Sequence, residues 1–246
     1  MNSARKVALV TGVLFIITII ASIPAQFILY APVLNNADYI VSGADSRVQW
    51  GALLEMITAL ACIGTAVVLF PIVKRQDEAV ALGYVAVRVF EAGIIVVGIA
   101  SVLSVVTLRQ DLAGAGGADP ASLLTAGKSL VAFHDATFLL GPGILAGLGN
   151  GALLGYLMYT SGLVPRHMAL LGLVGGPLVS ASGIAMLLGL YEPVSVWAAI
   201  ATVPEFFWEL LLGIWLIVKG FKPSAIISEP DTTDLKAKGE KSLARA

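Results

Sequence analysis

Six stretches of the sequence are apolar for long enough to cross a membrane, and this feature constrains the fold more than any other. A spanning helix needs about 20 mainly apolar residues. Ile, Leu and Val fill these stretches without the alternation that strands show, so the sequence predicts an all-α transmembrane bundle. The expected spans are residues 7–30, 49–73, 80–108, 132–159, 166–190 and 194–219.

The composition argues against several other classes of protein. Hydrophobic residues make up 58% of the 246 residues and charged residues only 13%, whereas a soluble domain carries about 25% charged residues. With so few charged residues, the expected partner is the lipid bilayer. The net charge of -1 argues against a basic face for a nucleic acid. The single cysteine, Cys62, cannot form an internal disulfide, and the sequence has no Cys and His spacing typical of zinc sites. We expect neither a metal nor a cofactor.

The lysine and arginine residues predict the orientation, because cytoplasmic loops are enriched in them. If both termini are cytoplasmic, the basic residues near the spans divide unequally between the two sides. The inner side carries Arg5, Lys6, Lys74, Arg75, Arg166, Lys219 and Lys222, and the outer side carries Arg47, Arg109 and Lys128. This excess favours a membrane domain over residues 1–222 with both termini inside. The polar residues 223–246 are expected to form a disordered cytoplasmic tail.

Ionisable side chains inside the predicted spans are the main indication of function. They are Glu55, Arg88, Glu91, Glu205 and Glu209. A charge at the bilayer centre costs roughly 2.5 kcal/mol or more, so these side chains should face the protein interior or a wet cavity. Residues three or four apart share a helix face, and we therefore predict that Arg88 bridges to Glu209, with Glu91 sharing the guanidinium.

The predicted site has more carboxylates than cations. Four glutamates around Arg88 would leave at least one of them, Glu205 or Glu55, driven toward its protonated form by burial and like charge. A carboxyl that exchanges a proton is what proton-coupled transport requires. We therefore expect a site at the membrane midplane that binds a small solute, or moves it together with protons. Pro204, directly before Glu205, is typical of the interrupted helices that transporters use at binding sites.

Two alternatives remain open. The charged residues could form a purely structural network in a membrane scaffold or a partner-binding protein. An intramembrane enzyme is the second alternative, with Glu205, Glu209, Glu55 and His134 around a divalent metal. His134 and Asp135 are adjacent and point to different faces of the helix, which favours an outer-surface cap or a proton entry point.

The fourth predicted span carries a regular series of glycines, namely Gly143, Gly147, Gly151 and Gly155. Their four-residue spacing places them on one helix face, where a neighbouring helix can approach closely. We expect this face to serve helix packing, with the glycine-rich fifth span as its partner. Asn150, on the same span, is expected to form an interhelical hydrogen bond.

Two segments resemble a known family of bacterial multi-pass membrane proteins. They are residues 154–166, with the sequence LGYLMYTSGLVPR, and residues 84–92, with the sequence YVAVRVFEA. Together with the order of the spans, they resemble the domain of unknown function 4386 (DUF4386) family over nearly the whole chain before the tail. The resemblance implies a six-helix integral protein of the bacterial cytoplasmic (plasma) membrane. It implies no activity, and neither the solute nor the oligomeric state follows from the sequence.

Overall fold

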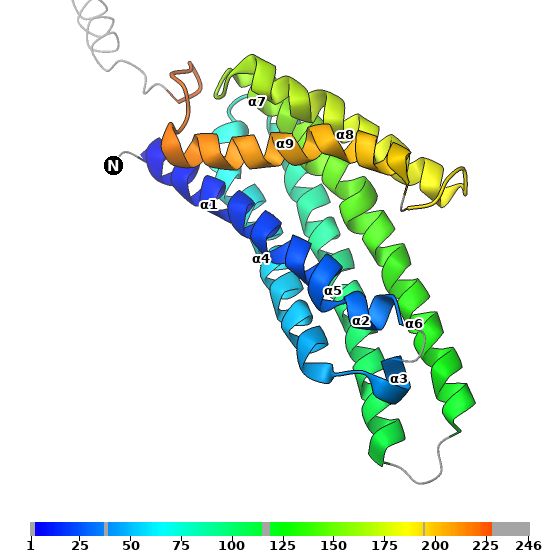
Figure 1. Ribbon diagram of the computed structural model, residues 1–246. Helices are drawn as coiled ribbons and strands as arrows, with labels where there is room; N and C mark the ends of the chain where they lie inside the picture. The colour runs from blue at the N-terminus through cyan, green and yellow to red at the C-terminus, as the bar shows by residue number, and fades with distance from the viewer. Residues whose placement is uncertain (1–2, 37–38, 115–118, 194, 228–246) are drawn as a thin grey trace, which may run out of the picture.

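A computed structural model describes residues 3–36, 39–114, 119–193 and 195–227, and this part of the chain is helical, without strands (Figure 1). The six predicted spans are confirmed, since six helices are long and apolar enough to cross a membrane. The protein is therefore an integral multi-pass membrane protein. The elements are α1 (Ser3–Pro24), η1 (Ala25–Leu29), α2 (Ala31–Leu34), α3 (Tyr39–Ser42), α4 (Asp45–Val73), α5 (Glu78–Gly114), α6 (Pro120–Leu140), η2 (Gly141–Leu145), η3 (Gly147–Leu154), α7 (Gly155–Ser161), α8 (Arg166–Leu187) and α9 (Val196–Val218).

The fourth span is one long helical segment whose middle is π-helical. It runs through α6, η2, η3 and α7, and the π-helical parts η2 and η3 contain most of the glycines of the predicted series. Glycine offers no side chain that would resist rewinding of the helix, which makes this stretch permissive for the wider turn of a π-helix. α7 ends at Ser161, and the next residue, Gly162, has the left-handed conformation (φ 64°), which glycine adopts at little cost because it lacks a Cβ.

The helices pack in a consistent order around the buried core. α1 lies against α4 and α9, α4 against α5, and α5 against α6, whereas α8 packs against both α9 and η3. Figure 1 shows α8 and α9 crossing one end of the bundle at a steep angle to the long hairpin of α5 and α6. The start of α1 lies beside the end of α9, where Arg5 donates hydrogen bonds to the carbonyls of Leu216 (2.8 Å) and Ile217 (2.6 Å). A cation at this position satisfies free carbonyls at the helix end.

The third and fourth spans are longer than predicted. α5 extends to Gly114 and α6 begins at Pro120, so most of the expected loop is helical, and its remaining residues 115–118 lie outside the described part of the chain. At about 1.5 Å per residue, α5 exceeds the roughly 30 Å hydrocarbon core. The ends of α5 and α6 are held by a separate apolar cluster with α2 and α3, which the sequence did not predict. Its buried members are Tyr30, Val33, Tyr39, Ile40, Val48, Val102, Val105 and Val106.

Polar contacts fix the same end of the bundle. Arg109 pairs with Asp45 (2.9 Å) and donates to the carbonyl of Gly43 (2.7 Å), which ties the start of α4 to the end of α5. The hydroxyl of Tyr39 donates to the carbonyl of Ala44 (3.3 Å). Burial, together with the nearby Asp45 carboxylate, raises the pKa of Tyr39 to about 12. The basic residues predict that this end faces the outside.

The opposite end contains the first residues of the predicted tail. Lys222 donates its amide to the carbonyl of Leu163 (2.7 Å), and the hydroxyl of Ser224 donates to the carbonyl of Ser161 (2.7 Å). Arg75 reaches the carbonyl of Ile226 (3.1 Å). Residues 223–227 therefore lie against the protein, whereas residues 228–246 of the expected tail are outside the described part of the chain.

Candidate functional site

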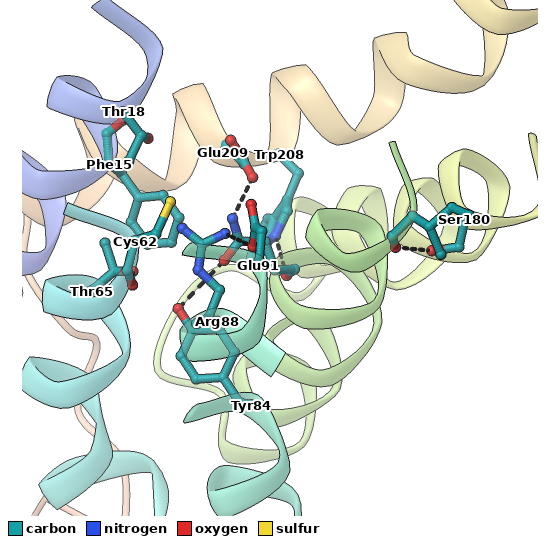
Figure 2. Close-up of polar contacts among 12 residues, drawn as sticks. Phe15, Thr18, Cys62, Thr65, Tyr84, Arg88, Glu91, Ser180, Trp208 and Glu209 are labelled. Carbon is teal, nitrogen blue, oxygen red and sulfur yellow. Dashed lines mark hydrogen bonds and ion pairs between the residues drawn. The ribbon is translucent and has the colours of Figure 1, made fainter. Parts of the chain in front are cut away.

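The centre of the candidate site is Arg88 on α5. Its side chain is 1% exposed, and its Nη1 lies 2.6 Å from Oε2 of Glu91, one turn further along the same helix. Figure 2 shows the Arg88 side chain between Cys62 of α4 and Glu91, with Glu209 of α9 above them in the view. We use the name Arg88 cluster for Arg88, Glu91, Asn150, Glu205 and Glu209.

Asn150 connects the helices of the cluster. Its side-chain amide donates to Glu209, and its side-chain oxygen accepts from the hydroxyl of Tyr84 on α5 (3.4 Å). Its backbone carbonyl accepts from Nε1 of Trp208 (2.8 Å). The predicted interhelical hydrogen bond of Asn150 is therefore confirmed, and η3 links α5 to α9 through this residue.

The predicted ion pair between Arg88 and Glu209 is wrong. Arg88 pairs with Glu91, and Glu209 is within electrostatic reach of the guanidinium but accepts its hydrogen bond from Asn150. The sequence correctly indicated which faces of α5 and α9 carry the charged residues, but not that η3 packs against both helices. Because η3 packs against both α5 and α9, its Asn150 takes the position next to Glu209 that the prediction gave to the guanidinium.

Glu205 is the least satisfied member of the cluster. Its side chain is 5% exposed, and neither carboxylate oxygen has a hydrogen-bond partner among the described residues. It is close enough to Glu209, Arg88 and Glu91 to interact with them electrostatically. Three carboxylates are thus grouped around one guanidinium, and Glu205 is the one without a donor. This arrangement is suited to holding a proton.

The glycines of the fourth span determine how closely Glu205 can approach. A Cβ placed on Gly151 would lie 2.5 Å from Oε2 of Glu205 and even closer to the Cα of Gly176 on α8. A Cβ on Gly175 would lie 2.7 Å from the amide nitrogen of Glu205. Only glycine leaves room for the carboxylate between η3 and α8.

The other members of the glycine series also lie at the contact with α8. A Cβ on Gly147 would lie 2.6 Å from the carbonyl oxygen of Gly176, and one on Gly155 would lie 2.7 Å from the amide of Leu173. Gly143 contributes its backbone, because a Cβ on Gly183 would lie 2.8 Å from the Gly143 carbonyl oxygen. A π-helical turn holds more residues than an α-helical one, so residues four apart still share a face.

The structure does not bring Glu55 into the Arg88 cluster. Glu55 is 8% exposed and lies near Tyr30 and His134 instead. Ala59 of α4 and Ala92 and Ile95 of α5 lie between the two places along their helices. They belong to one apolar group, whose other buried members are Ala52, Cys62 and Ile99. The expected single site of five residues therefore consists of two separate sites. Tyr30 was missed because nothing in the sequence relates it to Glu55.

The residues of the proposed metal enzyme are divided in the same way. Glu205 and Glu209 belong to the Arg88 cluster, whereas Glu55 and His134 lie beyond the apolar group. In the part of the chain that the structure describes, no group of three or more His, Cys, Asp or Glu residues is placed to hold a metal ion. His134 is 2% exposed, and its Nδ1 lies 3.6 Å from Oδ1 of Asp135, whose side chain is 63% exposed.

Comparison with known proteins establishes the family. The family model described as a domain of unknown function (DUF4386) matches residues 10–220. The chain belongs to the DUF4386 family. This confirms the resemblance seen in the sequence, and the match includes most of the first span and all of the other five spans of this DUF4386 protein.

A relative of this DUF4386 protein from Archaeoglobus fulgidus is named only as an uncharacterized protein. It is 34% identical over 84 residues, which cover 32% of this chain and 44% of the relative. The match therefore spans less than half the length of that relative. No solved structure matches the chain.

Proposed function

We propose that this DUF4386 protein is a carrier of the bacterial cytoplasmic membrane that binds and releases a proton at the Arg88 cluster as it moves a small solute. Both termini would be cytoplasmic. The observation that carries the proposal is Glu205, a buried carboxyl whose oxygens have no donor among the described residues. Among the described residues, it interacts electrostatically with two further carboxylates and with one guanidinium.

The charge balance supports a proton on Glu205. Arg88 compensates Glu91 directly, and the neutral Asn150 gives Glu209 a hydrogen bond. An ionised carboxylate buried without a partner carries a desolvation penalty of several kcal/mol, and such groups become neutral instead. Glu205 therefore holds its proton in this conformation. Release of that proton requires a donor to reach Glu205, so protonation and conformation are coupled.

The backbone around Glu205 supports such a rearrangement. Pro204 lies inside α9 and has no amide to donate to the carbonyl four residues earlier. Opposite it, η3 is π-helical, a conformation found mostly as single turns and frequently at functional sites. A helix with a missing hydrogen bond faces one with an irregular turn, which is the type of element that transporters use at their binding sites.

Infrared difference spectroscopy in lipid tests the proposal without knowledge of the solute. Between acidic and alkaline buffer, the wild-type protein should show a carboxylic-acid C=O band that disappears in Glu205→Gln. Glu192→Gln is the matched control, because Glu192 is exposed between α8 and α9. A pH jump on protein adsorbed to a supported membrane should also give a transient current that is smaller in Glu205→Gln than in the wild type.

The structural alternative predicts a different result. If the Arg88 cluster only fixes the helices, Glu205→Gln should keep both the infrared band and the transient current of the wild type. That outcome would overturn the proposed function. Loss of the band and a smaller current in Glu205→Gln, with both signals unchanged in Glu192→Gln, support it.

A further inference from the structure

The second buried site lies between α4, α5 and α6, at the end of the bundle that the basic residues predict to be outside. Glu55 of α4 and His134 of α6 line a small cavity of about 10 Å³ together with Ile95 and Gly98 of α5. This volume is close to the roughly 10–15 Å³ that one water molecule needs. The cavity is therefore large enough for a single water between the carboxyl and the imidazole.

Glycines make room for the side chains around His134. A Cβ on Gly98 would lie 2.6 Å from Oγ1 of Thr137, which lines the same cavity, and one on Gly51 would lie 2.6 Å from the ring of Tyr30. The rings of Tyr30 and His134 meet edge to face, with centroids 5.6 Å apart. The imidazole thus packs against Tyr30, and its Nδ1 has no hydrogen-bond partner among the described residues.

A larger hollow lies along the same part of α6. It has a volume of about 350 Å³ and opens between α2, α3, α5 and α6. Its lining includes Asn35, Asn36, Tyr39, Lys128 and Asp135. Asp135 is the neighbour of His134 in the sequence, with Oδ1 3.6 Å from Nδ1. The imidazole therefore lies between the exposed carboxylate in the hollow and the buried carboxyl of Glu55.

From this arrangement we infer that Glu55 is a second proton-binding carboxyl, reached from the outer side through Asp135 and His134. Asp135 takes a proton from solvent and gives it to Nδ1 of His134. The imidazolium then gives the proton on its other ring nitrogen to the Glu55 carboxylate, directly or across the small cavity. The imidazole is left neutral and the carboxyl protonated, and the reverse order of steps releases the proton.

The groups that face this site are consistent with such a path. Tyr30 follows η1 and adjoins Glu55, α6 contributes His134, and α5 contributes the uncharged Ile95 and Gly98. The apolar group that includes Ala59, Ala92 and Ile95 separates Glu55 from the Arg88 cluster. Glu55 is therefore an outer station, and a proton passes from it to the Arg88 cluster only when this apolar layer opens.

The inference rests on the proposed function for its biological role. Its test measures protonation of Glu55 rather than of Glu205. The probe is the proton alone, applied as a rapid pH jump to full-length protein in lipid vesicles and followed by time-resolved infrared spectroscopy. Glu55→Gln should remove a carboxylic-acid band that Glu205→Gln leaves intact. His134→Gln should slow the appearance of that band about a hundred-fold, the lower end of the contribution of a positioned proton carrier.

Asp135→Asn provides a second variant if His134→Gln fails to fold, because Asp135 is exposed. It should also slow the appearance of the Glu55 band. Asp111→Asn should not, because Asp111 is an exposed residue near the end of α5 that takes no part in the proposed path. A spectrum of Glu55→Gln that is identical to the wild type, or an unchanged rate in His134→Gln or Asp135→Asn, overturns the inference. If the Glu55 band behaves as expected but Glu205→Gln changes nothing, the proposed function fails and the outer station stands.

Discussion

Asn150 donates its side-chain amide to Glu209, and through this contact the irregular fourth span joins α9. The backbone carbonyl of Asn150 is bound as well, by Trp208 Nε1 at 2.8 Å. One residue of η3 thus satisfies both a carboxylate and an indole of α9. The Arg88 cluster depends on η3 as much as on the charged helices that the sequence emphasised.

Removal of the Asn150 amide should destabilise the protein through Glu209. In Asn150→Ala, the Glu209 carboxylate loses its donor, and a buried group left unsatisfied costs about 1–3 kcal/mol. The free energy of unfolding in mixed detergent and SDS micelles measures the loss. Addition of Glu209→Gln to Asn150→Ala should recover part of it, because the amide side chain carries no charge. A double variant that is no more stable than Asn150→Ala would contradict this explanation.

Replacement of Arg88 should expose which glutamate it compensates. Arg88→Met leaves a buried carboxylate unpaired, which costs about 3–5 kcal/mol. Since the ion pair is with Glu91, Arg88→Met with Glu91→Gln should recover more stability than Arg88→Met with Glu209→Gln. The same unfolding measurement ranks the two double variants, and the opposite order would mean that Glu209 is the true partner.

Gly151 should tolerate no side chain. In Gly151→Ala, the added methyl group meets the Cα of Gly176 and the carboxylate of Glu205. Overpacking of this kind typically costs about 1–3 kcal/mol, and the backbone of α8 cannot move aside as a flexible side chain would. The thermal unfolding midpoint in detergent should fall.

Gly93→Ala is the matched control for Gly151→Ala. A Cβ on Gly93 would have no neighbour within 4 Å among the described residues, and alanine favours a helix over glycine by roughly 0.5–1 kcal/mol. This variant should match or exceed the wild-type midpoint. Equal losses in the two variants would mean that the close contact at Gly151 is not responsible.

Stability should fall in alkaline solution because of Tyr39. Its pKa in the folded protein is raised to about 12 from the ordinary value of 10.0, through burial and the nearby Asp45 carboxylate. Between these values the unfolded chain releases the proton while the folded protein keeps it, so the free energy of unfolding decreases as pH rises. Below pH 10 the contribution is constant.

Tyr39→Phe removes the group that titrates. The free energy of unfolding of this variant should depend less steeply on pH between 10 and 12 than that of the wild type. Chemical unfolding at several pH values in this range compares the two slopes. Equal slopes would show that Tyr39 does not retain its proton in the folded protein.

Part of the candidate site was predictable from the sequence. Buried charges in membrane helices must face protein, so Arg88, Glu91 and Glu205 could be identified from their positions alone. Asn150 could be identified for the same reason, since a polar amide in such a helix needs a partner. Spacing along one helix gave the pair Arg88 and Glu91 a common face, although the prediction assigned the main ion pair to Glu209.

The remaining features of the site could be predicted only with knowledge of which helices pack against one another. Glu55 is the same type of residue as Glu205 and also lies in an apolar stretch, yet it faces Tyr30 and His134. A sequence specifies the face of a residue but not which helix packs against that face. The π-helical turns of η3 were equally inaccessible, because glycine permits several backbone conformations and packing against α8 and α9 selects among them.

The sequence by itself determined six membrane-crossing helices and the residues that had to be buried within them. This follows because a backbone in lipid must satisfy its own hydrogen bonds and because the length of an apolar stretch sets what it can span. Only the tertiary structure decided that the buried charges form two sites and that η3 lies between α5 and α9. Those outcomes depend on contacts between helices far apart in the chain, where steric fit and hydrogen-bond geometry select the partner.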